Sequence, residues 1–354
     1  MRGTPTVRPA VRGEAAVTLD AVARRARVST ATVSRVLNGA GGVREATRER
    51  VLRAVEELRY TPNLNARALA GAGTRTLGVV VSNIANPFFL DIFHSVEAGA
   101  RARGYDVIVA NTDYAPDRLT ESVTAMLGRR VAGLALVVSE TVPAAAVDVL
   151  DALAARGSPV VLYDGGSHRL RGVPNIRADY RGGMTRIVEY LHGLGHRRMA
   201  FVGHHARLGP LHDRQQAFLA AAREYGRRVQ VQAVESTDGF EGGRDGVARL
   251  LDAGFRPTAV VCVNDLMAVG AIGALRARGL AVPADVSVTG FDNIALAEFA
   301  HPPLTTADVP REAVGRLLCD ALLASPDTPG PAGPELVVDT PLVVRESTAA
   351  PRGG

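Results

Sequence analysis

A short polar face near the N-terminus has the residue types that read bases in DNA. Within residues 17–38 (VTLDAVARRARVSTATVSRVLN), apolar residues recur at helical spacing on both sides of a turn centred on Arg27, which predicts two short helices. The outward face of the second helix consists of Thr30, Ala31, Ser34 and Arg35. These side chains are small or carry a guanidinium, so the helix can lie deep in a major groove, where a helix-turn-helix reads base edges. An amphipathic helical hairpin with a solvated face is the alternative interpretation.

Capping residues and a third helix complete this module. Thr18 and Ser29 are expected to cap the first and second helices, because their hydroxyls can accept a backbone N–H at a helix N-terminus. A third helix is expected over residues 45–59, and its inward face consists of Val51, Val55 and Leu58. The pattern predicts a helix-turn-helix DNA-binding domain over residues 17–62.

A second set of polar residues follows predicted β-strands. From residue 76 onward, short β-branched runs alternate with amphipathic helices, which is typical of a parallel, doubly wound sheet. Ligands bind such sheets beyond the carboxyl ends of the strands. The polar residues at those ends are Asn83, Asn111, Thr112, Asp164, Asn264, Asp265, Asp292 and Asn293. Any one of these is more often a loop cap than a ligand contact, but five strand ends facing one cleft favour a ligand site.

The number of strands indicates two α/β subdomains. The strand candidates span residues 76–82, 105–111, 133–139, 159–164, 198–203, 229–234, 258–264 and 286–292. The helices between them include residues 88–103, 143–156, 182–193 and 265–279. About ten strands in all exceed a comfortable single sheet, so we expect two similar subdomains.

Composition limits the functional classes. Residues 1–75 hold 14 Arg against 6 Asp and Glu, whereas the whole chain of 354 residues has a net charge of only +5, so the basic module is expected to meet phosphates. The sequence contains no lysine, which excludes a P-loop lysine and Schiff-base chemistry. Residues 1–16 read as a disordered basic tail and not as a signal peptide, and no apolar run is long enough for a membrane span. A cytoplasmic location is therefore expected.

Catalytic and metal-binding interpretations are weak. His192 and His196 are four residues apart, but glycines interrupt the segment and no glutamate lies beside the first histidine. Cys262 and Cys319 lie in separate apolar segments and are expected to be core residues. Since no nucleophile, base and orienting group occur together, we expect neither an enzyme, nor a metal site, nor a cofactor.

The segments VTLDAVARRARVSTATVSRVLNG and VREATRERVLRAVEELRYTPNLNARALA resemble the N-terminus of the LacI/GalR family of transcriptional repressors, and the resemblance extends to about residue 350. It implies a periplasmic-binding-protein fold over residues 76–354, in which the chain crosses three times between two halves. The first half is expected to contain about residues 76–175 and 311–338. The second is expected to contain about residues 176–310 and 339–348.

The resemblance also implies DNA contacts beyond the helix-turn-helix face. Residues 63–75 match a hinge helix and linker that orders on operator DNA, and Leu69 matches a leucine that is wedged into the minor groove. Without the resemblance, this segment would be interpreted as a plain linker. Further DNA-binding positions are Thr18, Ser29, Thr32, Asn38 and Asn63.

Effector residues follow from the same resemblance. Asp292 matches a carboxylate that accepts hydrogen bonds from effector hydroxyls or ring nitrogens, and Arg214 matches a cationic fork for the effector. The remaining matched positions are Phe88, a wall aromatic, and Asp164, Asn264 and Asp265. Such a set suits a small polyhydroxylated ring, such as a sugar. The position of a second wall aromatic holds Asp238, and tryptophan is absent from the chain, which leaves the stacking partner unassigned.

Two further departures from the family pattern concern the DNA-binding module. Arg27 stands where the turn usually has glycine, and Arg44 stands where the third helix usually has a serine cap; each is expected to cost about 1 kcal/mol. The resulting hypothesis is a homodimeric transcriptional regulator, a repressor, that binds a near-palindromic operator and responds to a sugar-like effector. A solute-binding receptor without DNA function is the alternative.

Overall fold

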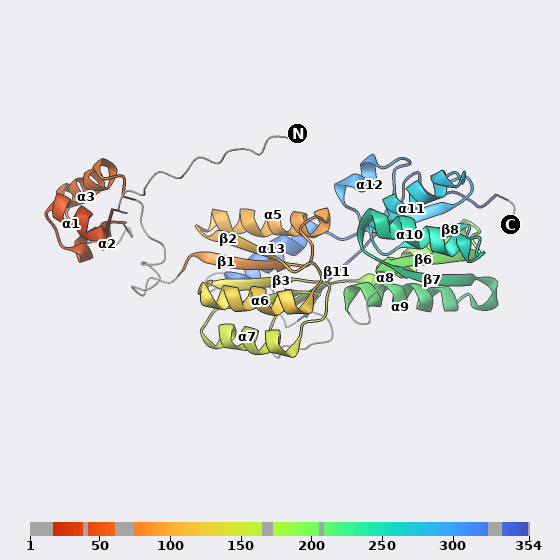
Figure 1. Ribbon diagram of the computed structural model, residues 1–354, viewed down its shortest axis with the longest axis horizontal. Coiled ribbons are helices and arrows are strands. Elements are labelled where there is room, and N and C mark those ends of the chain that lie inside the picture. The colour runs from red at the N-terminus through yellow and green to blue at the C-terminus, as the bar shows by residue number, and fades with distance from the viewer. Residues whose placement is uncertain are drawn as a thin grey trace, which may run out of the picture. The chain divides into compact units, whose positions relative to one another are not determined.

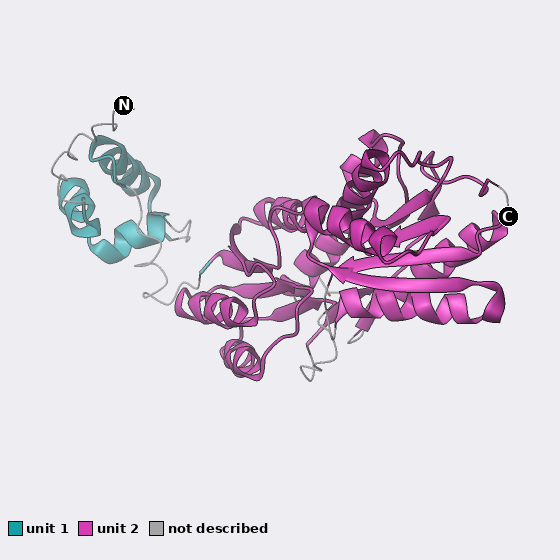
Figure 2. Ribbon diagram, turned by 45° about the vertical axis from the view of Figure 1, so that its right-hand side comes forward, with its two compact units in different colours: residues 1–74 teal, residues 75–354 magenta. Residues whose placement is uncertain are grey.

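The computed structural model describes residues 17–37, 42–60, 74–164, 173–204, 209–324 and 335–352. The chain divides into two compact units, residues 1–74 and residues 75–354, which Figure 2 shows in different colours. The first unit is helical and the second is α/β, so the expected fold class is confirmed. The predicted tail over residues 1–16 and most of the predicted hinge, with Asn38, Asn63 and Leu69, lie outside the described residues.

The helical unit consists of α1 (Leu19–Ala26), α2 (Thr30–Leu37) and α3 (Glu45–Glu57). The two predicted caps are present: Thr18 Oγ1 accepts a hydrogen bond from Ala21 N at 3.3 Å, and Ser29 Oγ accepts one from Thr32 N at 3.2 Å. Small apolar side chains form the core between the three helices, namely Val22, Ala23, Ala26, Val33, Val36, Val51 and Ala54. Because so small a core contributes little stability, the helix caps and turns are expected to make a substantial part of the unit's stability.

Both departures from the family pattern have the expected local geometry. Arg27 ends α1 in the left-handed region with φ 54°, and Arg44 precedes α3 without a side-chain capping hydrogen bond. The third helix ends at Glu57, two residues earlier than predicted, because Arg59 turns the chain with φ 47°.

The first sheet of the α/β unit has six parallel strands in the order β11-β5-β4-β3-β1-β2. In chain order these strands are β1 (Thr76–Val81), β2 (Asp106–Asn111), β3 (Gly133–Val137), β4 (Val160–Tyr163), β5 (Asn175–Ala178) and β11 (Glu335–Val338). Helices α5 (Pro87–Ala102) and α13 (Arg311–Leu322) pack on one face, while α6 (Pro116–Gly128) and α7 (Ala144–Ala155) lie on the other, as Figure 1 shows.

Strand alternation explains why both faces are covered. Leu77, Val79 and Val81 of β1 belong to one buried cluster and Val80 belongs to the other, since successive side chains of a strand point to opposite faces. A strand buried on both faces is expected to read as a continuous apolar run, and β1 does.

The second sheet has the order β12-β10-β9-β8-β6-β7, and only β12 is antiparallel to its neighbour. Its strands are β6 (Arg198–His204), β7 (Gln230–Ser236), β8 (Ala259–Cys262), β9 (Ser287–Asp292), β10 (Thr305–Asp308) and β12 (Leu342–Val343). Its helices are α8 (Tyr180–Gly193), α9 (Pro210–Arg223), a 3-10 turn (Gly226–Arg228), α10 (Gly239–Asp252), α11 (Asp265–Ala277) and α12 (Ala295–Phe299). Cys262 and Cys319 are free and buried in the core, as predicted.

The chain passes between the two sheets three times, after β5, after β10 and after β11. We refer to the first sheet with α5, α6, α7 and α13 as the first half, and to the second sheet with α8 to α12 as the second half. Two glycines let α10 and α11 pack closely: a Cβ on Gly243 would lie 1.9 Å from Met267 O, and one on Gly270 would lie 2.0 Å from Phe240 O. This close packing brings the N-termini of the two helices together.

Candidate DNA-reading face and effector site

Helix α2 presents the predicted DNA-reading residues to solvent. Thr30, Ala31 and Arg35 are exposed, whereas Val33 and Val36 on the opposite side are buried. Ser34 lies on the same outward side and is half-buried. This is the geometry in which a recognition helix offers one guanidinium and several small side chains to base edges.

Three of the predicted DNA-binding residues have structural roles in this unit. Thr18 caps α1, and Ser29 caps α2. Thr32 Oγ1 lies 2.9 Å from Ser29 Oγ, so these two hydroxyls pair with each other at the start of α2. An exposed cap can still contact a phosphate through its remaining lone pairs and nearby backbone N–H groups.

A buried ion pair lies at the centre of the candidate effector site. Arg214 Nη2 lies 3.0 Å from Asp292 Oδ1, and each residue is only 3% exposed. Arg214 Nη1 also donates to Val263 O at 2.8 Å. Arg214 Nε has no hydrogen-bond partner among the described residues. A buried charged pair with unused hydrogen-bonding capacity is what a ligand with polar groups could complete.

The protonation states of the pair follow from its surroundings. Burial raises the pKa of Asp292 to about 6, and the nearby charge of Arg214 opposes that rise. Burial lowers the pKa of Arg214, but the charge of Asp292 and the neighbouring tyrosines raise it above its ordinary value. The pair is therefore ionised at neutral pH.

Aromatic rings hold the guanidinium of Arg214 in place. Its Cζ lies 4.5 Å from the ring centroids of both Tyr180 and Phe291, a cation–π arrangement. The Tyr180 hydroxyl donates to Asp164 Oδ2, and Asp164 Oδ1 accepts from Ala178 N at 3.3 Å. Burial raises the pKa of Asp164 to about 7, while the hydrogen bond from Tyr180 and the charge of Arg214 lower it. Arg214, Asp292 and Asp164 thus form one connected group.

Asn264 joins the same region from the N-terminus of α11. Its Oδ1 accepts from Met267 N at 2.9 Å, so it caps the helix, and its Nδ2 donates to Asp238 Oδ1 at 2.8 Å. The charge of Asp238 also raises the pKa of Asp292. Asp238, which the sequence marked as an unusual residue, is thereby part of the polar network.

Asp265 makes its hydrogen bonds outside this group. Its Oδ1 accepts from Thr306 Oγ1 at 2.6 Å and its Oδ2 accepts from Ile294 N at 2.8 Å, so it connects α11 to β10 and to the segment after β9. The side chain is fully buried, and burial raises its pKa to about 8, although the charge of Asp292 also contributes to that rise. These contacts support a role in the fold, although its neighbour Asn264 faces the polar network.

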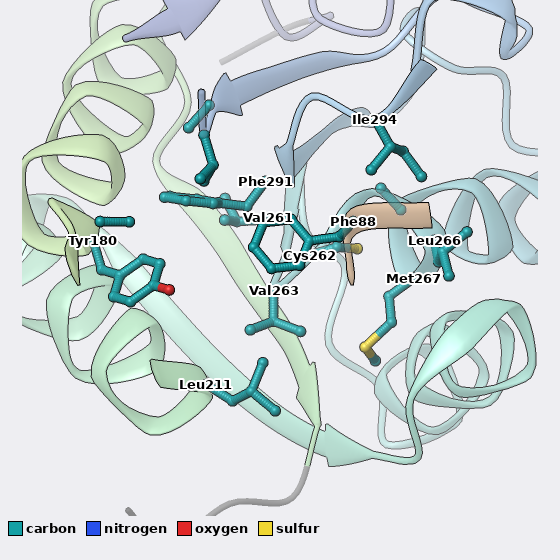
Figure 3. Close-up of a cluster of buried hydrophobic side chains, with 14 of the residues drawn as sticks. Phe88, Tyr180, Leu211, Val261, Cys262, Val263, Leu266, Met267, Phe291 and Ile294 are labelled. Atoms are coloured by element: carbon teal, nitrogen blue, oxygen red, sulfur yellow. The ribbon is translucent and has the colours of Figure 1, made fainter. Parts of the chain in front are cut away.

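Phe88, which was predicted to be a wall aromatic, lies in the hydrophobic core. It belongs to the buried cluster drawn in Figure 3, together with Tyr180, Leu211, Val263 and Phe291. Its ring meets that of Phe89 edge-on, with centroids 5.2 Å apart. Because Phe88 comes from α5 in the first half and the others named come from the second half or the crossover into it, this cluster spans both halves.

Sequence reasoning missed a carboxylate at the strand ends of the first half. Glu140, which follows β3, accepts hydrogen bonds from Ser82 and Thr112, the residues after β1 and β2. Its position just after a strand candidate was the available signal. It also missed Tyr114, whose hydroxyl donates to Asp238 Oδ2 at 2.7 Å across the two halves.

Backbone strain is concentrated at these strand ends. Asp164, Asp292 and Asn293 have φ values of 50°, 112° and 53°, in the region that L-residues seldom adopt. Arg311 at the start of α13 holds the last of these by donating to Asn293 O at 2.8 Å, and it also donates to Asp91 on α5 at 2.9 Å. Strain of this kind persists where the surrounding structure holds it, often at binding sites.

The remaining candidates have structural explanations. His196 is buried, with Nδ1 3.0 Å from Thr258 Oγ1 and Nε2 2.9 Å from Ala349 O. Within the described ranges, no group of three or more His, Cys, Asp or Glu residues could hold a metal ion. Every helix in that part of the chain is too short or too polar to span a bilayer.

Comparison with known proteins explains this arrangement. Residues 18–63 match the bacterial regulatory proteins of the lacI family, and residues 188–348 match a periplasmic-binding-protein-like domain. The chain is 34% identical over 331 residues to the ribose operon repressor of Haemophilus influenzae, an alignment that covers 93% of this chain and 98% of the relative. The chain belongs to the LacI family.

Solved structures of LacI-family proteins agree with the fold. The lac repressor dimer bound to operator and the anti-inducer ONPF matches with a TM-score of 0.79 at 28% identity, covering 95% of this chain and all of that chain. A LacI family transcriptional regulator from Enterococcus faecium with bound ribose matches with a TM-score of 0.67 at 27% identity, covering 78% of this chain and all of that one. This LacI-family chain is a DNA-binding transcriptional regulator with an effector-binding domain, and the interpretation as a solute receptor without DNA function is not supported.

Proposed function

We propose that this LacI-family regulator is a repressor that binds a near-palindromic operator as a homodimer and changes its operator affinity when a sugar or sugar derivative binds between its two α/β halves. The ribose operon repressor and the operator-bound lac repressor dimer among its relatives support this assignment. Dimer symmetry would require each half-site to mirror the other. The chain is proposed to act by binding and not by catalysis.

The observation that carries the effector proposal is the buried pair Arg214–Asp292. A polyhydroxylated ring presents both donors and acceptors, so one hydroxyl can donate to the Asp292 carboxylate while an oxygen accepts from Arg214 Nε, which has no hydrogen-bond partner among the described residues. Two further side chains are connected to this region: Asn264 donates a hydrogen bond to Asp238, and Asp164 accepts one from Tyr180. The ribose bound to the Enterococcus faecium relative is a ligand of this class.

On the DNA side, Arg35 is proposed to contact a guanine with both arms of its guanidinium, with Thr30 and Ala31 setting the neighbouring base preference. Thr18, Ser29, Thr32 and Ser34 are proposed to position the helix on phosphates. Residues 63–75 are proposed to form the hinge between the two units, and Asn38, Asn63 and Leu69 are proposed to contact DNA.

The DNA assignment is tested on a duplex selected from random-sequence DNA by the full-length protein. Arg35→Ala is expected to lower affinity for the selected duplex by about 1–3 kcal/mol, while affinity for scrambled DNA changes far less. Arg53→Ala removes the same charge from the exposed surface of α3 and serves as the matched control. Equal losses on selected and scrambled DNA would exclude a base-reading role for Arg35.

The effector assignment is tested by thermal unfolding with ribose, other pentoses and hexoses as probes. A ligand at a hundred times its dissociation constant adds about 2.7 kcal/mol to stability, which is visible as a raised melting temperature. Asp292→Asn is expected to abolish the shift because it removes the acceptor charge beside Arg214. If no sugar raises the melting temperature, or if Asp292→Asn retains the shift, the proposed sugar site is wrong.

A further inference from the structure

One tyrosine hydroxyl extends from the first half of the α/β unit to the second. Tyr114 lies in the loop between β2 and α6, and its hydroxyl donates to Asp238 Oδ2 at 2.7 Å, just before α10. Its ring also lies 5.2 Å from the ring of His204 at the end of β6. The contact is far in sequence from the three chain crossings, so no nearby covalent connection brings these residues together.

Asp238 is oriented for this contact at the expense of its own helix. It occupies the N-cap position of α10, where an aspartate usually accepts hydrogen bonds from the first turn, yet its side chain makes no capping bond. Instead, Oδ1 accepts from Asn264 Nδ2 at 2.8 Å while Oδ2 accepts from Tyr114. The carboxylate is therefore satisfied by side-chain donors from other elements and not by the first turn of its own helix.

The loop that carries Tyr114 is held in an unusual conformation. Asp113 and Tyr114 have φ values of 52° and 59°, two consecutive left-handed residues that are not glycine. This conformation is unfavourable for L-residues other than glycine, because Cβ comes close to the following carbonyl oxygen. Asp113 fastens the loop by accepting from Asn111 Nδ2 at 2.7 Å and by pairing with Arg118. The strained backbone is therefore supported locally, and it directs Tyr114 toward the second half.

The chemistry of the pair keeps the hydroxyl as a donor. Burial, and then the negative charge of Asp238, raise the pKa of Tyr114 well above its ordinary value. The phenol remains protonated throughout the physiological range, and its hydrogen bond to a carboxylate is of the stronger, charge-assisted kind.

We propose that Tyr114 is a positioning residue, and that its hydrogen bond to Asp238 is a latch that holds the two halves of the effector-binding domain in one relative position. The latch ends on Asn264, which caps α11 and belongs to the candidate effector site, so the same side chains that meet a ligand also fix the two halves. The link to effector response rests on the proposed function, whereas the latch itself does not.

The latch is tested by amide hydrogen exchange of the full-length, ligand-free protein. Tyr114→Phe keeps the ring against His204 and removes only the hydroxyl. It is expected to speed exchange several-fold both in residues 111–118 of the first half and in residues 237–241 of the second, because opening between the halves becomes easier. The matched control is Tyr190→Phe, since the Tyr190 hydroxyl lies 3.0 Å from Thr348 Oγ1 and both residues belong to the second half. This control is expected to leave both segments unchanged.

A double-mutant cycle separates a latch from two unrelated local effects. Asp238→Ala alone is expected to speed exchange of residues 111–118 as Tyr114→Phe does, and the double variant is expected to add nothing further there. Unchanged exchange at residues 237–241 in Tyr114→Phe, multiplicative effects in the double variant, or the same response from Tyr190→Phe would each overturn the latch. None of these measurements uses a sugar or DNA, so failure of the latch is distinct from failure of the proposed function.

Discussion

The DNA-reading face and the effector site hold their functional side chains in opposite ways. Thr30, Ala31 and Arg35 on α2 are exposed, and their positions depend only on the helix that carries them. Arg214 and Asp292 are 3% exposed, and their positions depend on rings, backbone carbonyls and a strained strand end. A residue on the exposed face can therefore change binding without changing folding, whereas the buried site couples the two.

The largest expected effect concerns the buried pair. Arg214→Met would leave Asp292 buried without its opposite charge, which typically costs about 3–5 kcal/mol in the free energy of unfolding. Urea unfolding of the α/β unit measures this loss. Arg278→Met is the matched control, because its ion pair with Asp252 is at the surface, where pairs contribute about 0–1 kcal/mol. Similar losses in the two variants would contradict the contrast between buried and exposed sites.

A smaller effect is expected from pH acting on Asp164. Its pKa rises from 3.8 to about 7 on folding because the carboxyl is buried. The folded state binds this proton more tightly than the unfolded state, so the stability it contributes is full below about pH 4 and is lost as the pH rises through about 7. Asp164→Asn removes this titration. The free energy of unfolding of the Asp164→Asn variant minus that of the unsubstituted protein is expected to rise by about 1–3 kcal/mol between about pH 5 and pH 8. Urea unfolding at each pH measures this difference. A difference that does not vary with pH would contradict a buried, titrating Asp164.

The smallest effect is expected in the helical unit. Arg27 is exposed and has φ 54°, so Arg27→Gly relieves left-handed strain while it increases the freedom of the unfolded chain. The net gain is expected to be about 0.5–1 kcal/mol, visible as a higher melting temperature of this unit. Arg24→Gly, in the interior of α1, is the control and is expected to destabilise it. If both substitutions destabilise the unit, the turn at Arg27 is not strained.

Local rules predicted the helical unit well. The caps at Thr18 and Ser29 and the missing cap at Arg44 each depend on one side chain and the adjacent backbone. Four short strands were harder to predict: β5, β10, β11 and β12 have two to four residues each and were not among the eight strand candidates. Their pairing comes from the sheet that receives them and not from their own hydrophobic pattern.

For the effector site, the strand ends could be predicted from the sequence, but the directions in which their side chains point could not. Asn264 and Asp265 are adjacent, yet one faces the polar network and the other is used inside the second half, because one caps α11 and the other lies in its first turn. Tyr114 gave no sequence signal at all, since its contact with Asp238 joins residues 124 positions apart and depends on a left-handed turn. Such long-range contacts follow from the assembled fold.

The last described stretch, residues 335–352, supplies an edge strand to each sheet: β11 pairs with β5 in the first and β12 with β10 in the second. During translation, a growing chain that has not reached residue 335 lacks part of both sheets at once. The described helices of the first unit, by contrast, are complete once residue 60 has left the ribosome. Domains generally fold as units in the order of their synthesis, so the DNA-binding module is ready first, and the part that would sense a ligand matures only after residues 335–352 have been made.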